Sequence, residues 1–140
     1  MTPVNPQIKA VLNRQRVQQK LLANVAMVDE AEACRLLGKS TCNPSATMKG
    51  KEDEGEVLRF TVDGRAVYPV FQFDLEGQRV FPVMKALIAT APPTWSSFKI
   101  LHWLTRPHLE FAALPATALG VDPDKVLQAF QRVIEPDVHG

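Results

Sequence analysis

The side chains that could carry metal or nucleophile chemistry are few and stand far apart. They are Cys34, Cys42, His102, His108 and His139. None has the close-spaced partner of a structural zinc site, and no cysteine and histidine can be paired as nucleophile and base. Cys34 falls on the packing side of a predicted helix and is better interpreted as a small core residue. The sequence therefore predicts no catalytic residue, no metal and no cofactor, and we expect a protein that is not an enzyme.

One segment resembles part of a phosphate-binding loop. The run Gly38-Lys39-Ser40-Thr41 matches the end of that motif, which also needs a glycine five residues before its second glycine. Ala33 occupies that position, and the segment follows a predicted helix rather than a strand. Nucleotide binding at this segment is therefore not expected.

Charge is nearly balanced over the chain but unevenly distributed. The 140 residues carry a net charge of +1, and their hydrophobic fraction of 46% supports a packed core. Residues 1–28 contain no acid and four bases, Lys9, Arg14, Arg16 and Lys20. All of these except Arg14 share one side of a predicted helix. This basic stripe is either a solvated face or an arm that contacts phosphates or a second copy of the chain.

Nothing in the sequence indicates a membrane or an export signal. No stretch approaches the roughly 20 apolar residues of a spanning helix, and the N-terminal residues lack the apolar run of a secretory signal. Two cysteines do not make a disulfide framework. We therefore expect a cytoplasmic protein with no membrane association.

Start and stop signals predict the elements of the N-terminal half. A helix is expected from Asn5-Pro6 to about residue 27, a second over 30–37 with Asp29 as its cap, and a third over 44–54 that begins at Asn43-Pro44. Two extended runs, 56–62 and 65–69, flank Asp63-Gly64. Because Asp-Gly favours the type I′ turn, these runs predict a β-hairpin.

The C-terminal half is predicted to be helical and divided by prolines. Helices are expected over 81–91, from a cap at Thr94 to just before Pro107, over 114–119, and from Asp122-Pro123 to about Ile134. The polar, proline-containing residues after Ile134 predict a mobile tail. The fold class is thus mainly α with one β-hairpin. We divide it into a basic N-terminal helix (1–27), a winged helix-turn-helix-like domain (28–74) and a compact helical array (75–140).

Three stretches resemble known families. The run from Asp29 to Gly38 is similar to the first helix of excisionase-like and MerR-like DNA binders. The run Tyr68-Pro69-Val70-Phe71-Gln72-Phe73-Asp74 resembles a junction in the Xre/MbcA/ParS antitoxin-like group. Trp95 with Ile100-Leu101-His102-Trp103-Leu104-Thr105-Arg106-Pro107 resembles that group's tryptophan and proline signature.

This resemblance implies an antitoxin-like protein. Such proteins bind and neutralise a cognate toxin, often a NAD-degrading toxin of the RES type, and often repress their own promoter. The implied partner-binding residues here are Trp95, Trp103, Arg106, His108 and Asp137. Both tryptophans are interpreted first as core anchors and second as toxin contacts. Asp137, in the tail, would pair with cationic groups of the toxin.

Residues for DNA contact are predicted on three elements. They are Ser45, Thr47, Lys49 and Lys51 on the second helix of the helix-turn-helix, Arg59 and Arg65 on the hairpin, and Arg16 and Lys20 on the basic arm. A reading helix normally offers Arg, Lys, Asn or Gln to base edges. Here the helix ends in three acids, residues 52–54, which repel phosphates. Weak or non-specific DNA binding is therefore expected.

Two functions remain open from the sequence. The first is an antitoxin-like regulator that binds a toxin and operator DNA. The second is an interaction adaptor whose winged helix no longer binds DNA and serves packing or oligomerisation. An apolar strip of Val11, Leu21, Leu22 and Val25 on the first helix favours a symmetric homodimer.

Overall fold

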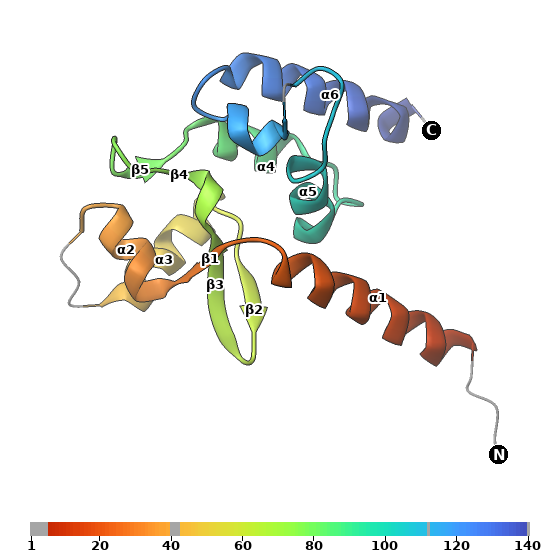
Figure 1. The fold of residues 1–140 in the computed structure, drawn as a ribbon, viewed down its shortest axis with the longest axis horizontal. Coiled ribbons are helices and arrows are strands. Elements are labelled where there is room, and N and C mark those ends of the chain that lie inside the picture. Colours follow the sequence, from red (N-terminus) through yellow and green to blue (C-terminus); the bar gives the residue numbers. More distant parts are fainter. Residues whose placement is uncertain (1–5, 40–42, 112, 140) are drawn as a thin grey trace.

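The computed structural model, which describes residues 6–39, 43–111 and 113–139, is mainly helical with two small antiparallel sheets (Figure 1). Two short 3₁₀ turns, η1 and η2, complete the fold. In chain order the elements are α1 Pro6–Ala23, β1 Met27–Asp29, α2 Glu30–Leu36, α3 Pro44–Asp53, β2 Phe60–Val62, β3 Arg65–Pro69, η1 Val70–Gln72, β4 Phe73–Asp74, β5 Arg79–Val80, α4 Val83–Thr90, α5 Ser97–Leu104, η2 Pro115–Ala118 and α6 Pro123–His139.

Local capping sets the starts of α2 and α3, as predicted. The Asp29 side chain accepts a hydrogen bond from the Glu32 backbone N–H at 2.8 Å, and the Asn43 side chain accepts one from the Ala46 N–H at 3.2 Å. Each cap satisfies a backbone donor that a helix start leaves without a partner. The predicted bounds of α2 and α3 are therefore confirmed to within one residue.

The hairpin is confirmed, but the prediction of one hairpin alone was wrong. Asp63 and Gly64 take positive φ values of 51° and 76°, as a type I′ turn requires. The first helix ends at Ala23 instead of residue 27, and the next residues form β1, which pairs antiparallel with β3 in the sheet order β1-β3-β2. The predicted boundary after residue 27 thus falls inside a strand. A second sheet, β4-β5, was not expected.

A buried glutamine explains why the first extended run is shorter than predicted. Only Phe60–Val62 of the expected 56–62 is a strand. Just before it, Gln72 accepts a hydrogen bond from the Leu58 N–H at 2.8 Å and donates one to the Leu58 carbonyl at 3.0 Å. The fully buried Gln72 side chain takes the place of a neighbouring strand there.

The C-terminal helices are where predicted, with shifted ends. The cap of α5 is Ser96, which accepts from the Lys99 N–H at 3.2 Å, and not Thr94. Residues 115–118 form a 3₁₀ turn instead of an α-helix. The last helix continues past Ile134 to His139, so the predicted end of this helix near Ile134 was wrong. In the described part of the chain, no helix is long and apolar enough to cross a membrane.

Two hydrophobic clusters lie on either side of the three-stranded sheet. The smaller one joins α2 and α3 to the sheet through Cys34, Met48 and Tyr68. Cys34 is fully buried as predicted, and burial raises the pKa of its thiol. The larger cluster contains α4, α5 and α6 and reaches the hairpin through Phe60, whose ring centroid lies 4.9 Å from that of Phe98. Both halves therefore share the sheet as a common support.

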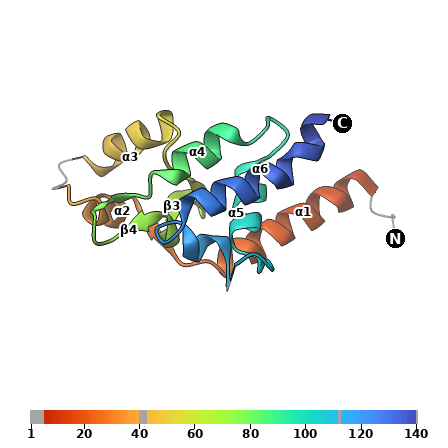
Figure 2. The ribbon, with the colours of Figure 1, turned by 90° about the horizontal axis from the view of Figure 1, so that it is seen from above.

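Helix α1 extends away from the rest of the molecule (Figures 1 and 2). None of its residues is buried, and Val11 near its start is 47% exposed. Only its end and the segment that follows, with Leu21, Leu22 and Val25, pack on the larger cluster. The predicted apolar strip is thus divided: its end is used within the chain and its beginning is exposed.

Candidate functional site

A groove between the starts of α2 and α3 and the hairpin holds some of the predicted DNA-contacting residues. It has a volume of about 460 Å³ and runs between the first residues of α2 and α3 on one side and the hairpin on the other. Ser45, Arg59 and Arg65, from separate segments, line it together. Asp29 and Glu30 form part of the same lining, so the groove has both charges.

Two polar side chains that line this groove, Arg59 and Ser45, are bonded to acidic residues. Arg59 Nε lies 3.1 Å from Glu52 Oε1, and the Tyr68 hydroxyl donates to the other oxygen of Glu52 at 3.0 Å. Burial, and then the Glu52 carboxylate, raises the pKa of Tyr68. Ser45 donates its hydroxyl proton to Glu30 at 3.2 Å. The hairpin cation Arg65 is exposed beside the turn.

Lys51 does not lie with the other predicted DNA-contacting residues. Its Nζ pairs with Glu56 at 3.0 Å, and the hydrogen bond from Lys51 lowers the pKa of the Glu56 carboxyl. Both line a separate cavity of about 280 Å³ beside Arg79 and Lys85. Lys49, by contrast, is on the exposed side of α3, whereas Thr47 is half-buried. The four predicted residues of α3 therefore do not share one surface, and their contact with DNA stays a prediction.

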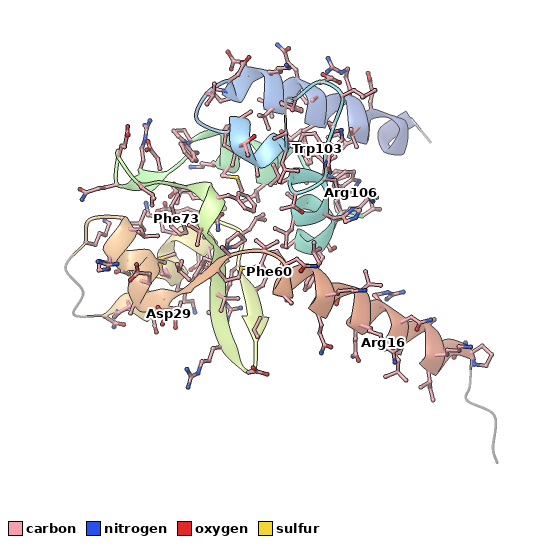
Figure 3. The ribbon with its side chains drawn as sticks, viewed as in Figure 1. Arg16, Asp29, Phe60, Phe73, Trp103 and Arg106 are labelled. Atoms are coloured by element: carbon pink, nitrogen blue, oxygen red, sulfur yellow. The ribbon has the colours of Figure 1, made fainter. Side chains whose placement is uncertain are left out.

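The basic arm is remote from this groove. Arg16 and Lys20 are both exposed on α1, and Figure 3 shows Arg16 well away from Asp29 at the start of α2. One molecule therefore presents two separate groups of cations.

A second cleft, in the C-terminal half, brings together four of the five predicted partner-binding residues. Its volume is about 590 Å³, and α5, α6 and the residues after α5 form it. Figure 3 shows Trp103 and Arg106 on this part of the molecule. The described residues that line it are Trp95, Lys99, His102, Trp103, Arg106, Pro107, His108 and Val133. The fifth predicted residue, Asp137, lies on the last turns of α6, and its side chain is outside the described part of the structure.

Aromatic rings and cations alternate in this cleft. Lys99 Nζ stands 4.4 Å from the centre of the Trp95 ring, within the range of a cation–π interaction. The Trp103 ring lies 5.2 Å from His108 on one side and 5.1 Å from Phe130 on the other. Both tryptophans are thus core residues that also line a surface cleft, so the two interpretations from the sequence are compatible.

Four residues of this cleft were not among those predicted from the sequence, although two of them had a usable signal; they are Lys99, His102, Pro107 and Val133. Lys99 and His102 are three residues apart, which places them on one face of α5, and Arg106 follows two residues after the helix ends at Leu104. This periodicity could have identified Lys99 and His102. Val133 comes from α6, more than 25 residues away, and no local pattern connects it with α5.

Comparisons with known proteins give one structural likeness. No family model matches the chain, and no curated protein matches it. A solved structure described as "NMR structure of Rv2175c" is similar, with a TM-score of 0.66 and 18% sequence identity over 79% of this chain and 82% of that chain. At this identity the likeness concerns the fold alone. The resemblance to the Xre/MbcA/ParS group stays a prediction.

Proposed function

We propose that this chain is a DNA-binding regulator that uses a winged helix-turn-helix. The observation that carries the proposal is the order α1-β1-α2-α3-β2-β3 with the sheet order β1-β3-β2. This arrangement sets the start of α3 and the hairpin turn beside one groove. In helix-turn-helix proteins the second helix enters the major groove with its N-terminal residues against the bases, and a hairpin beside it can reach the phosphates.

The positions of the charges on α3 are compatible with this mode of binding. Ser45 lies at the start of the helix, where bases would be read, Lys49 lies at its middle, and the acids Asp53 and Glu54 lie at its far end. Few cations are available on this side, because Arg59 is paired with Glu52 and Lys51 lies in a separate cavity, paired with Glu56. Binding is therefore expected to be weak and strongly dependent on salt.

The test is fluorescence anisotropy with two labelled duplexes, one from upstream of the gene and one of random sequence, over a range of salt. Changing Lys49 and Arg65 together to Ala should weaken binding and reduce the salt slope by about 2, since each cation that neutralises a phosphate adds about one to that slope. Lys125→Glu, which changes the net charge equally in the other half, is the control and should bind normally. No binding at low salt, or an equal weakening in the control, would contradict the proposal.

A second candidate function is protein partnering of the antitoxin type, in a cytoplasmic protein without catalytic activity. The α5–α6 cleft favours it, because four residues selected for partner binding lie around one hollow. Co-purification with the product of the adjacent reading frame tests this proposal. An adaptor that binds a partner but no DNA would be identified by success here together with failure of the anisotropy experiment.

A further inference from the structure

We propose that the α5–α6 cleft binds an acidic, carboxylate-bearing segment of a partner protein. The inference rests on the second candidate function, a partner site in the C-terminal half, and adds the chemistry of that partner. The cleft is the hollow of about 590 Å³ that α5, α6 and residues 105–108 enclose.

Arg106 is oriented for a carboxylate. Its Nη1 donates to His102 Nε2 at 3.1 Å, which holds the guanidinium group beside α5. A guanidinium group has five N–H donors, so donors remain for a two-point hydrogen bond with a carboxylate. Lys99, seven residues earlier on α5, adds a second positive charge to the lining. An acidic segment alongside α5 would meet both charges.

The tryptophans supply a rigid apolar floor between these charges. Trp95 and Trp103 are 8% and 6% exposed, and both pack edge-on against Phe130. Val133, at 39% exposure, adds an apolar edge. The indole Nε1–H of Trp103 is buried without an acceptor among the described residues, a donor that calls for an explanation. Such a floor suits a segment that places an apolar side chain beside its carboxylates.

The distribution of charge favours an acidic protein over a nucleic acid. None of the described residues that line the cleft is Asp or Glu, so a carboxylate meets no repulsion within the lining. Outside the lining, however, residues 92–140 contain only two Lys or Arg against five Asp or Glu. A duplex needs an extended positive surface, whereas a short acidic segment needs only the local one.

The experiment uses the full-length protein labelled with ¹⁵N at its tryptophans, and a fluorescent twelve-residue peptide of alternating Glu, Asp and Leu. The matched peptide has Gln and Asn in place of the acids. The acidic peptide should bind at least about tenfold more tightly than its neutral match, equivalent to about 1.4 kcal/mol, and should shift both indole N–H signals. Arg106→Glu should weaken binding by about tenfold or more, and Arg106→Lys by less, because Lys keeps the charge but cannot form the two-point hydrogen bond.

Lys39→Glu is the charge-reversal control, since Lys39 is exposed after α2 in the other half, and it should bind the peptide normally. Equal binding of the neutral peptide, or a 20-base-pair duplex that shifts the same indole signals and displaces the peptide, would overturn the inference. So would a natural partner whose binding is unaffected by Arg106→Glu, although that result would leave the proposed partner function intact. Binding of the acidic peptide that depends on Arg106 supports the inference even if the adjacent gene product fails to bind.

Discussion

The groove beside the hairpin and the α5–α6 cleft differ in the acidic residues that lie among their cations. In the groove, Arg59 is paired with Glu52, and Asp29 and Glu30 form part of the lining. In the cleft, the lining contains cations and aromatic rings and, among the described residues, no carboxylate. The proposal of DNA binding at the groove rests on the arrangement of its helices and hairpin. The proposal of an acidic partner at the cleft rests on the charge of its lining.

This difference shows that counting charged residues in a sequence can mislead. Lys51 and Arg59 count as basic residues for DNA contact, but the fold places each beside an acid. A surface ion pair of this kind contributes little to stability, about 0–1 kcal/mol, so DNA phosphates could compete for either cation. Arg106, with a histidine as its neighbour, is not neutralised in this way.

The largest effect is expected from Phe130→Ala. This fully buried ring lies 5.3 Å from Trp95 and 5.1 Å from Trp103, so its removal leaves a cavity below the cleft. The free energy of unfolding should fall by about 3–5 kcal/mol, measured by urea denaturation. Below the unfolding transition, the variant should lose peptide binding more than DNA binding. Equal loss of both would show that the two surfaces are not separable.

Gln72→Leu should have the next largest effect. The Gln72 side chain satisfies the N–H and carbonyl of Leu58, and leucine would leave both buried and without a partner. We expect a loss of about 2–3 kcal/mol in the free energy of unfolding. Because β2 begins two residues after Leu58, hydrogen exchange should quicken at the hairpin and not at α6. Uniform quickening would mean that this amide supports the whole molecule.

Gly64→Val acts on the groove alone. Valine resists the positive φ of 76° that Gly64 adopts in the hairpin turn, at a cost of about 1–3 kcal/mol. Thermal unfolding should detect the loss of stability, and DNA binding should weaken because Arg65 is displaced. The two indole signals should stay unchanged, since Gly64 does not line the cleft. Gly50→Ala is a useful control, because a Cβ at this glycine meets no atom within 4 Å.

The smallest effect is expected from Asp74→Asn, in the turn between β4 and β5, and it concerns stability at low pH. Asp74 accepts hydrogen bonds from the Gly77 N–H at 3.0 Å and from Arg79 at 3.2 Å. Both bonds lower the pKa of the Asp74 carboxyl, and the backbone bond from Gly77 has the larger effect. A lowered pKa stabilises the fold above the ordinary value of about 4, and this contribution is lost as the pH falls through the lowered value. Asp74→Asn should therefore flatten the dependence of stability on pH below about pH 5. An unchanged profile would assign the acid sensitivity to other carboxylates, such as Glu56.

The sequence by itself determined the features that depend on neighbouring residues. Asp29 and Asn43 cap helices, and Asp63-Gly64 turns a hairpin, because each acts on backbone groups a few residues away. The buried position of Cys34 also followed from the pattern of its own helix.

Only the tertiary structure decided the features that join distant segments. Met27–Asp29 forms a strand because β3 lies beside it, and Gln72 is buried because Leu58, fourteen residues earlier, offers it a donor and an acceptor. The fold likewise paired Arg59 with Glu52 and set Val133 beside α5. Hydrogen bonds and charge pairs act over a few ångströms in space whatever the separation along the chain. For that reason, local patterns located the elements of both surfaces, but the folded chain decided which side chains meet there.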